Sequence, residues 1–487
     1  MSIFNLKRKR NQKVRNKAGG EAFRQDPRVA LASLLLTSFA EDQFYRKGKQ
    51  TFKELEALLK EVDPQFAAKA AVFTRREYGM RSITHVMAGQ LAALASGQEW
   101  AKGFYEKIVR RPDDMLEIMA YYQSLGNKHL TNAMKKGFAK AFDHFDDYQL
   151  AKYRRENKAI RLVDMVNLVH PVPTQRNAKA LQLLVDGKLK SQNTWENKLT
   201  QAGQKAENAS DKKQKKAEAW TELIRSNKLG YFALLRNLRN IAEQAPDVLG
   251  DALGILTDRS RIKKSLVLPF RFMTAQQAIV DAQLPIKRKR SIQKALNKAL
   301  ELSIDNVPVF PGRTLVILDD SGSMTWGKKQ MGKTPIQIGA IFAAMLYKSN
   351  EADLMRFSDS AAYVYPYYAD AAGSIAERLI KQARSGGTNF HSIFQKANKA
   401  YDRIIILSDM QGWIGAHAPV QAFADYCKNY NADPFVYSFD LQGYGSSQLT
   451  GGKVFQLAGF SDKIFDLMGL LETNRNALVN KIDAVEL

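Results

Sequence analysis

A run of polar residues in the C-terminal part of the sequence has the composition of a metal site. Asp319 opens the run Asp-Asp-Ser-Gly-Ser, in which Ser321 and Ser323 each supply a hydroxyl group. Gly322 lets the chain turn tightly, so that both hydroxyls face inward. The run directly follows a short apolar segment, which places the Asp319 carboxylate at the end of a predicted strand.

Two further oxygen donors follow later in the chain. Thr388 comes after two glycines, and Asp409 stands just beyond the apolar run 403–407. Oxygen ligands of which few are charged suit Mg²⁺ or Mn²⁺ better than zinc. The protein supplies too few oxygen ligands to fill the six coordination positions of such a metal ion. Water therefore takes some of the remaining positions, and one position is open to a carboxylate from another molecule. The alternative is that the two aspartates only cap the helices that follow them.

The elements that must hold these donors alternate between strands and helices. Apolar runs typical of buried parallel strands occur at 314–318, 403–407 and 434–439. Helical patterns separate them, at 336–348, 371–384 and 418–429, and the last 25 residues predict a terminal helix. This alternation predicts a doubly wound α/β domain, in which ligands bind beyond the carboxyl ends of the strands.

The preceding part of the chain has a different pattern. From about residue 27 to 300 apolar residues recur with the period of a helix, and no convincing alternation of a strand is seen. So long a helical stretch favours stacked helix pairs over one bundle. We therefore predict three parts: a basic flexible arm at 1–20, a helical-repeat domain at 21–308 and the α/β domain at 309–487.

The charge is divided unevenly between these parts. The chain has a net charge of +24, and residues 311–487 hold 17 basic and 17 acidic residues, so the whole excess lies before them. A basic part joined to a neutral one predicts two domains with different partners. For the basic part we expect a polyanion, most simply nucleic acid. The alternative is that the charge only keeps the protein in solution.

The composition and the absence of certain motifs exclude several classes of protein. Of the 487 residues 45% are hydrophobic and 25% charged, as in ordinary soluble proteins. No apolar run is long enough for a membrane span, and no signal peptide is evident, so we expect a cytoplasmic protein with no membrane partner. The lone Cys427 agrees with a reducing compartment. No metalloprotease or phosphate-binding motif occurs, so we predict that the protein is not an enzyme.

The polar residues of the C-terminal part resemble a known site. Over residues 312–487, the Asp-x-Ser-Gly-Ser run, the Gly-Gly-Thr loop and the strand-end aspartate occur in the order found in von Willebrand factor A domains. The resemblance is to the metal-ion-dependent adhesion site of those domains. It implies a site for Mg²⁺ or Mn²⁺ made of Asp319, Ser321, Ser323, Thr388 and Asp409, the last often acting through water.

The whole chain resembles the Ro autoantigen family of TROVE-domain RNA-binding proteins, in its bacterial or phage form. The segments that carry this resemblance are 14–20, 152–155, 165–171, 233–238 and 268–270. It implies a monomeric ring of HEAT-like helical repeats closed by the A domain. It also implies partners: small noncoding Y-like RNA, single-stranded ends of misfolded or decaying RNA, and an exoribonuclease such as polynucleotide phosphorylase.

This resemblance implies a noncatalytic protein of RNA quality control or degradation. One alternative hypothesis is a metal-dependent adaptor, in which the A domain captures an acidic side chain of a protein and the helical part is scaffold. Another is a metal-dependent ribonuclease, although a nuclease usually clusters carboxylates around two metal ions.

Cationic side chains are the candidates for contact with RNA. Lys152, Arg154, Arg155 and His170 match the family, and Arg236 and Arg239 are spaced to share a helix face. His170 equally suits a helix end before a proline, and Arg236 equally suits a structural ion pair. Further candidates are Tyr153 and Phe270 as stacking rings, and Arg75, Arg76 and Arg81 from their charge alone.

Two lysine-rich segments remain without an assigned role. Residues 201–218 are polar and rich in lysine, which predicts either a mobile loop or a charged helix face. Residues 287–290 form a run of four cations before a helical pattern, and this run suits either solvent or phosphate contact.

Overall fold

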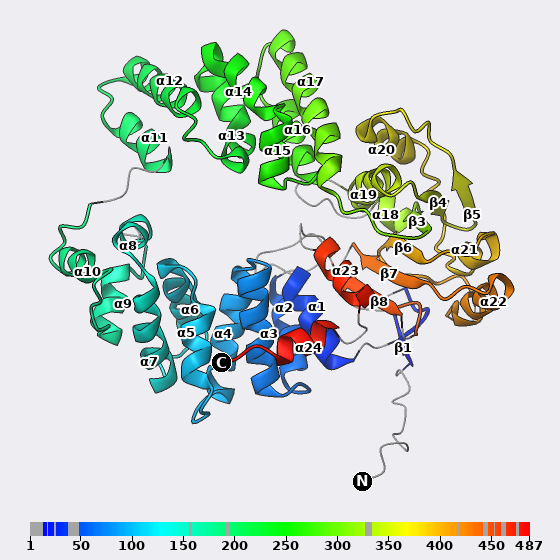
Figure 1. The fold of residues 1–487 in the computed structure, drawn as a ribbon, viewed down its shortest axis with the longest axis horizontal. Coiled ribbons are helices and arrows are strands. Elements are labelled where there is room, and N and C mark those ends of the chain that lie inside the picture. Colours follow the sequence, from blue (N-terminus) through cyan, green and yellow to red (C-terminus); the bar gives the residue numbers. More distant parts are fainter. Residues whose placement is uncertain are drawn as a thin grey trace.

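A helical part and an α/β domain follow one another around a ring-like circuit in the computed structural model (Figure 1). The structure describes residues 13–16, 18–23, 26–37, 48–154, 158–190, 195–326, 334–415, 418–441, 447–451, 453–458, 464–473 and 477–487. This arrangement confirms the predicted fold class, helical repeats followed by a doubly wound domain. None of the described helices is both long enough and apolar enough to cross a membrane.

In the first helical stretch, helices pack both on the next helix along the chain and on the helix after that. Its local signals are strong: in α3, for example, Pro64 occupies the first turn and the Asp63 carboxylate accepts from the Phe66 amide at 2.8 Å. The helices are α1 Pro27–Thr37, α2 Gly48–Leu59, α3 Pro64–Glu77, α4 Ser82–Leu94, α5 Ala101–Ile108, α6 Pro112–Ser124, α7 Asn132–Ala141, α8 Asp147–Lys152, α9 Leu162–Val169 and α10 Ala178–Val185.

The second helical stretch begins with the lysine-rich segment, which is helical. Residues 201–218 fall mostly within α11 and α12, which pack against each other, so the charged-helix alternative is the correct one. The cations of 287–290 lie in the first turns of α17. The helices are α11 Trp195–Gln204, α12 Ala209–Arg225, α13 Tyr231–Gln244, α14 Leu249–Leu256, α15 Arg259–Ser265, α16 Phe270–Asp281 and α17 Ile286–Ser303, with 3-10 turns at Phe142–His144, Pro246–Val248 and Ile304–Asn306.

The α/β domain has a mainly parallel sheet in the order β5-β4-β3-β6-β7-β8. Its strands are β3 Thr314–Asp319, β4 Asp353–Phe357, β5 Ala361–Val364, β6 Arg403–Ser408, β7 Phe435–Asp440 and β8 Val454–Ala458. Of these described strands, β5 alone runs antiparallel, because a tight turn joins it to β4. The helices are α18 Gly322–Trp326, α19 Pro335–Ser349, α20 Ala372–Lys381, α21 His391–Lys396, α22 Val420–Tyr430, α23 Ile464–Thr473 and α24 Ala477–Asp483.

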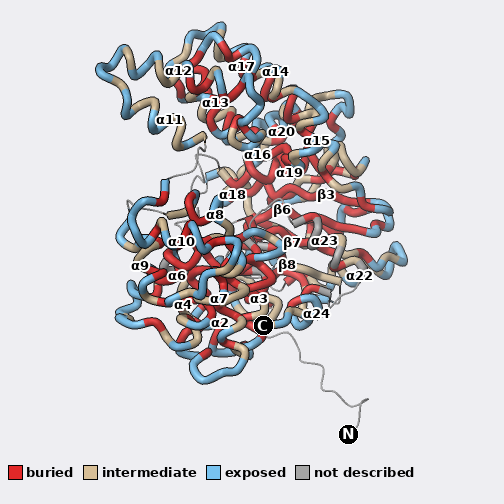
Figure 2. The backbone as a smooth tube through the Cα atoms, turned by 60° about the vertical axis from the view of Figure 1, so that its left-hand side comes forward, coloured by how far each residue is buried: buried red, intermediate tan, exposed pale blue. Residues whose placement is uncertain are grey.

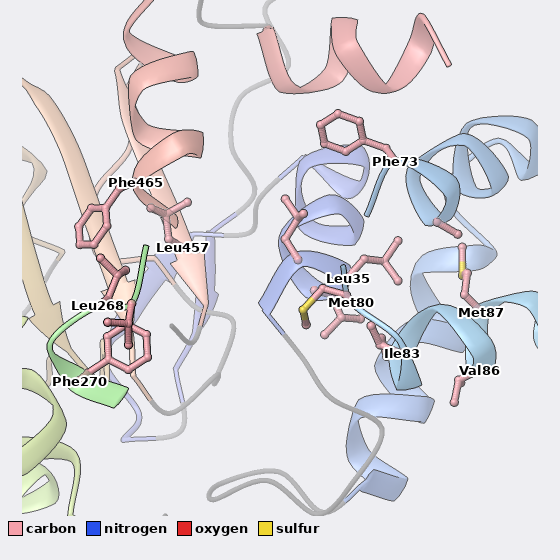
Figure 3. Packing of buried hydrophobic residues seen from close by; sticks show 14 of the residues in the cluster. Leu35, Phe73, Met80, Ile83, Val86, Met87, Leu268, Phe270, Leu457 and Phe465 are labelled. Atoms are coloured by element: carbon pink, nitrogen blue, oxygen red, sulfur yellow. The ribbon is translucent and has the colours of Figure 1, made fainter. Parts of the chain in front are cut away.

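The helical part and the sheet share one hydrophobic core. Buried residues occur along the chain from the first helices into the sheet domain (Figure 2), and their side chains belong to one cluster. Phe270 of α16 is buried and stacks on Phe342 of α19, with ring centroids 5.3 Å apart, and Figure 3 shows it near Phe465 of α23. Phe270 is therefore a packing ring, and the prediction that it stacks on RNA is wrong.

The described part of the N-terminal segment, which was predicted to be a flexible arm, contains regular structure. Strands β1 Lys13–Arg15 and β2 Glu21–Phe23 form an antiparallel hairpin. The buried Asn16 donates through Nδ2 to the Gly412 carbonyl of the α/β domain at 2.7 Å. For residues 13–16 and 18–20 the predicted flexible arm is thus replaced by a hairpin docked on the sheet domain; residues 1–12 and 17 lie outside the described part.

The C-terminal helix pair closes the ring. The predicted single terminal helix is divided into α23 and α24, and α24 packs against α1 and α3 at the start of the chain. Arg28 pairs with Asp483 at 2.6 Å, Lys69 Nζ donates to the Asp483 carbonyl at 2.6 Å, and Lys107 Nζ donates to the Glu486 carbonyl at 3.1 Å. The end of the chain therefore joins the sheet domain to the first helical stretch.

Candidate functional site

The predicted metal donors gather at the carboxyl edge of the sheet. Asp319 ends β3 and Asp409 follows β6, and these two strands are parallel neighbours. They also flank the point where the strand order reverses, since β4 lies beyond β3 and β7 beyond β6. This is the place where open α/β sheets bind ligands.

Hydrogen bonds fix both carboxylates but leave one oxygen without a partner. Ser408 Oγ donates to Asp319 Oδ2 at 2.5 Å, and the Ser321 amide donates to Asp319 Oδ1 at 2.9 Å. The Gln411 amide donates to Asp409 Oδ1 at 3.2 Å. Within the described residues, the buried Asp409 Oδ2 accepts no hydrogen bond. A buried carboxylate oxygen in this state is costly unless a cation or water meets it.

Both carboxylates have a raised proton affinity. Burial and the neighbouring Asp409 charge raise the pKa of Asp319 to about 7, against the hydrogen bonds from Ser321 and Ser408. Burial raises the pKa of Asp409 as well, although a hydrogen bond from Ser323 opposes it. Two buried acids that repel each other form a place where a divalent cation would be stabilised.

The hydroxyl groups and the glycine loop complete this site. Ser321 Oγ lies 3.3 Å from Ser323 Oγ, and the Gly322 amide donates to the Gly386 carbonyl at 2.8 Å. The second contact holds the loop that carries the buried Thr388 against the aspartate run. The structure thus links Asp319, Ser321, Ser323 and Asp409 and places the Thr388 loop beside them.

The chemistry of this donor set fits a hard divalent cation. Two carboxylates, hydroxyls and one unpartnered carboxylate oxygen are oxygen donors of the kind that Mg²⁺ and Mn²⁺ prefer. Asp320, next in the run, is instead paired with Arg384, whose Nε and Nη2 donate to its carboxylate at 3.0 and 2.9 Å. In the described part of the chain, this site included, no three His, Cys, Asp or Glu side chains form a metal-binding group, so the site would depend on its hydroxyl groups as well as its two carboxylates.

The RNA candidates on α8 contact aromatic rings and backbone. Lys152 is exposed, with Nζ 5.6 Å from the Tyr148 ring centroid and 5.4 Å from that of Tyr153. The Arg111 guanidinium covers the Tyr153 ring at 4.2 Å, so Tyr153 already has a stacking partner. Arg154 donates through Nη1 to the Leu189 carbonyl and so has a structural contact. Arg155 lies outside the described residues.

His170 lies at the end of a helix, which was the alternative to RNA contact that its sequence predicted. It follows α9 with a φ of 49°, and its amide donates to the Val166 carbonyl at 2.9 Å. The residue is exposed. The structure thus gives His170 a capping role and leaves its ring at the surface.

Arg236 and Arg239 come together on one exposed face of α13, as their spacing predicted. Both line a cavity of about 200 Å³ with Phe232 of the same helix and Arg271 of α16. Among the described residues Arg236 forms no ion pair, and Arg239 has only the exposed Glu243 at 3.9 Å. Sequence reasoning missed Arg271, because the packing of α16 on α13 leaves no local signal in the sequence.

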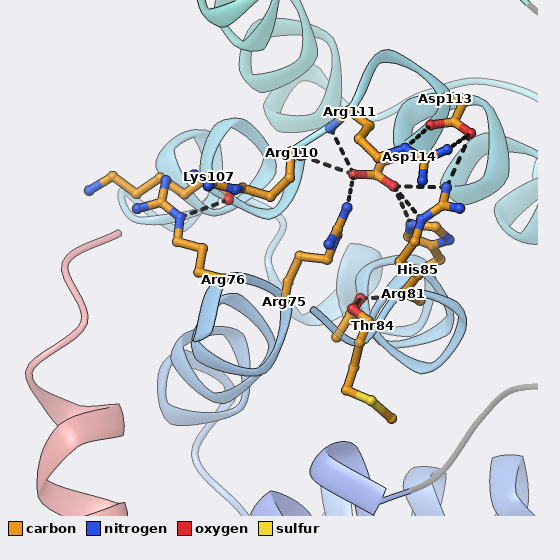
Figure 4. Close-up of polar contacts among 11 residues, drawn as sticks. Arg75, Arg76, Arg81, Thr84, His85, Lys107, Arg110, Arg111, Asp113 and Asp114 are labelled. Atoms are coloured by element: carbon orange, nitrogen blue, oxygen red, sulfur yellow. Dashed lines mark hydrogen bonds and ion pairs between the residues drawn. The ribbon is translucent and has the colours of Figure 1, made fainter. Parts of the chain in front are cut away.

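The arginines proposed from charge alone have structural roles. Arg75 is buried and pairs with the fully buried Asp114 at 2.7 Å, and Arg81 pairs with the same carboxylate at 3.1 Å (Figure 4). Arg76 donates through Nε to the Lys107 carbonyl at 3.2 Å. Arg75 is therefore held inside the helical stack, and its prediction as an RNA contact is wrong. Arg81 is paired with the same acid but is only half-buried, and its contact with RNA stays a prediction.

Comparison with known proteins gives matches along most of the chain. The TROVE domain matches residues 24–215 and 186–351. The "RNA-binding protein RO60" of Deinococcus radiodurans is 22% identical over 475 residues, which cover 87% of this chain and 88% of that protein. The crystal structure of the Deinococcus radiodurans RO (RSR) protein superimposes with a TM-score of 0.64 at 17% identity, covering 94% of this chain and 99% of that one.

Two mammalian proteins match a smaller part. "Telomerase protein component 1" of Rattus norvegicus and of Mus musculus are 21% and 23% identical over 359 residues, or 55% of this chain. The chain spans only 13% of the length of these two relatives.

Proposed function

This chain belongs to the TROVE domain family, and from that membership we propose that it is a noncatalytic RNA-binding protein. The resemblance read from its sequence is confirmed, since the chain is homologous to the Deinococcus protein over most of its length. That relative is named for RNA binding, and the charge of the helical part supports the same role here.

The observation that carries the proposal is the arginine face of α13. Arg236 and Arg239 project from consecutive turns beside a cavity, in a part of the chain that holds the whole excess of +24. Most other described arginines of this part are tied to carboxylates or carbonyls, as Arg75 and Arg154 are. Exposed guanidinium groups that lack strong partners are suited to phosphate, which supplies most of the affinity for RNA.

We propose that the RNA is a small noncoding Y-like RNA together with single-stranded ends of misfolded or decaying RNA. The protein would then act in RNA quality control in the cytoplasm, and pass such RNA to an exoribonuclease such as polynucleotide phosphorylase. The closure of the ring by α24 of the same chain supports a monomer, because no second subunit is needed to join its ends.

A second candidate function concerns the site on the α/β domain. We propose that Asp319, Ser321, Ser323, Thr388 and Asp409 hold Mg²⁺ or Mn²⁺, and the unpartnered Asp409 Oδ2 favours this. A bound cation would neutralise the two carboxylates and offer an open position to an acidic side chain. The domain would then act as a metal-dependent adaptor for a protein partner, alongside RNA binding by the helices.

The RNA-binding proposal is tested by a salt series. We would measure the affinity for a structured RNA with a single-stranded 3′ tail, comparing wild type with Arg236→Ala/Arg239→Ala. The control, Lys381→Ala/Lys396→Ala, removes the same charge from exposed positions of the neutral domain. Each lost phosphate contact lowers the slope of log affinity against log salt by about 0.7 to 0.9. We expect the arginine variant to lose affinity and slope, and the control to keep both.

Two results would count against the proposal. One is a wild-type protein that binds no RNA, or binds it without dependence on salt. The other is RNA that is shortened when labelled substrate is incubated with the pure protein and Mg²⁺ or Mn²⁺, which would favour the ribonuclease hypothesis instead.

A further inference from the structure

A second cavity lies at the junction of α11, α12 and α13, in the lysine-rich segment that the proposed function does not use. Its volume is about 480 Å³, within the range of small-ligand sites. Its lining combines aromatic rings, carboxamides and lysines, and the residues that carry the argument are Trp195, Lys212, Lys216, Trp220, Asn240 and Gln244.

The rings form one wall of the cavity. Trp195 of α11 and Trp220 of α12 are stacked, with centroids 6.3 Å apart and planes at 26°. Trp220 is almost fully buried, and its Nε1 donates to Gln244 Oε1 at 3.1 Å. Trp195 is half-buried. The inner ring thus supports the outer one, and the outer ring is the surface available for stacking.

The carboxamides of α13 present one donor and one acceptor. An indole N–H only donates, so Gln244 must turn its oxygen to Trp220, which leaves Gln244 Nε2 as a donor. The amide of Asn237 donates to the Ala233 carbonyl at 2.9 Å, so its oxygen accepts from Asn240 Nδ2 at 3.1 Å. Asn240 Oδ1 then accepts no hydrogen bond among the described residues. Because Asn240 and Gln244 are four residues apart, they lie on the same helix face.

Two lysines supply positive charge at the same cavity. Lys212 and Lys216 lie one turn apart on α12, and a Cβ built on Gly203 would be 3.6 and 3.5 Å from their Cε atoms. Neither forms an ion pair with another described residue, whereas the neighbouring Lys215 is paired with Asp211 at 2.7 Å. Glu196 also lines the cavity, so the two lysines outnumber the acid.

We propose that this cavity holds one nucleotide of a single-stranded RNA. Its base stacks on Trp195, the pairing edge of the base meets Asn240 and Gln244, and its phosphate contacts Lys212 and Lys216. Every base presents a donor beside an acceptor on that edge, and in a duplex the edge is already occupied. The site therefore accepts single strands of many sequences and rejects paired bases. This inference rests on the proposed RNA-binding function. It adds the location of a binding site and a preference for single-stranded over double-stranded RNA.

The position of α13 connects this cavity to the arginine face. Arg236, Asn240 and Gln244 follow one another at intervals of four residues along one row of the helix, and Arg239 lies on the adjoining row. Asn240 and Gln244 line the nucleotide cavity, and Arg236 and Arg239 line the other cavity. A strand that leaves the nucleotide cavity would cross α13 directly onto these arginines. The two cavities then form parts of one track for a single strand.

The test compares a labelled 12-nucleotide single strand with the same sequence as a duplex. Alanine in place of a stacking ring weakens binding by roughly 5- to 150-fold per base. We expect Trp195→Ala to weaken single-strand binding within this range, Trp195→Phe to retain most of it, and duplex binding to be unchanged in both. Lys212→Ala/Lys216→Ala should weaken binding more than Lys213→Ala, a control on the same helix whose side chain is exposed outside the cavity lining.

The outcomes separate this inference from the function on which it rests. If the wild-type protein binds RNA but Trp195→Ala, Asn240→Ala and the double lysine variant all behave like Lys213→Ala, the cavity is not a nucleotide site. If the wild type binds neither strand nor duplex, the proposed function itself fails. Lys212 and Lys213 are exposed, Lys216 is half-buried, and none of the three forms an ion pair with a described residue, so a loss of fold does not obscure the result of the lysine variants.

Discussion

Replacing Asp114 by asparagine should loosen the helical stack without touching an RNA contact. The Asp114 carboxylate is fully buried and accepts from Arg75 Nη2 at 2.7 Å, Arg81 Nη2 at 3.1 Å and His85 Nε2 at 3.0 Å, as well as from two backbone amides at 3.0 Å (Figure 4). Arg75 and Arg81, two of the arginines that the sequence suggested for RNA, are thus bound to one acid that connects α3, α4 and α6.

The size of the effect follows from the burial of Arg75. In Asp114→Asn the Arg75 guanidinium, only 6% exposed, would remain inside the protein without a charged partner. Removing one partner of a buried ion pair costs about 3 to 5 kcal/mol. Because about 1.4 kcal/mol corresponds to a factor of ten, local opening of this region should become roughly a hundredfold more frequent or more.

Hydrogen exchange of the amides between residues 75 and 114 measures this opening directly. Asp143→Asn, which breaks the exposed pair with Lys140, is the matched control and should change stability by less than about 1 kcal/mol. Equal protection in Asp114→Asn and the control would refute the reasoning. So would an Arg81→Ala variant that loses affinity for RNA while its exchange stays as slow as in wild type.

The same substitution has a predictable pH dependence. Burial alone would raise the pKa of Asp114, but the hydrogen bond from His85 and the charge of Arg75 hold it well below its ordinary value. Arg81 and, through Asp113, Arg111 add further positive charge around it. The group therefore stabilises the fold above the unfolded pKa of about 4, and this contribution is lost as pH falls through the lower folded pKa. The difference between wild type and Asp114→Asn should shrink steadily below about pH 4.

Three further predictions concern the metal site, the N-terminal hairpin and the ring closure. Mn²⁺ should raise the melting temperature of the wild type but not of Asp409→Ala, with equal RNA affinity in both; equal shifts would exclude the site. Gly20→Ala should release the N-terminal hairpin, since a Cβ there would lie 2.2 Å from the Gly412 carbonyl oxygen, and faster tryptic cleavage after Arg15 would report it. Asp483→Asn should lower the free energy of unfolding by at most about 1 kcal/mol in a urea titration, because its pair with Arg28 is exposed; a larger loss would mean that this pair holds the ring closed.

Much of the fold could be predicted because its signals are local. The helical period, the proline at the start of α3 and the apolar strands β3 and β6 are each visible within a few residues. The hairpin of β1 and β2 has only three residues in each strand, and Asn16 finds its partner Gly412 nearly 400 residues away. Such short strands carry no period, so only the folded chain shows that they pair.

The candidate metal site and the arginine face of α13 differ in how far local sequence predicts them. The metal donors Asp319, Ser321 and Ser323 come from one turn, and Asp409 follows a strand whose place beside β3 is fixed by the topology of the domain. Their proximity can therefore be read from the sequence, while their binding of a metal ion stays a prediction. The sequence around an arginine carries no such information. Arg75 and Arg236 look alike in the sequence, but Arg75 is neutralised by Asp114, 39 positions away, and Arg236 forms no ion pair with any described residue.

The role of each arginine or lysine side chain in this protein therefore depends on the partner that the fold places beside it. A guanidinium paired inside the stack cannot leave its carboxylate for a phosphate without exposing a buried charge, which costs several kcal/mol. Lys212 and Lys216 are in the opposite state, because they border a cavity and form no ion pair with a described residue, so a phosphate would displace no carboxylate from them. Binding to RNA should for this reason depend on the few cations at the cavities of α12 and α13, and the total charge of +24 by itself would be a poor guide to affinity.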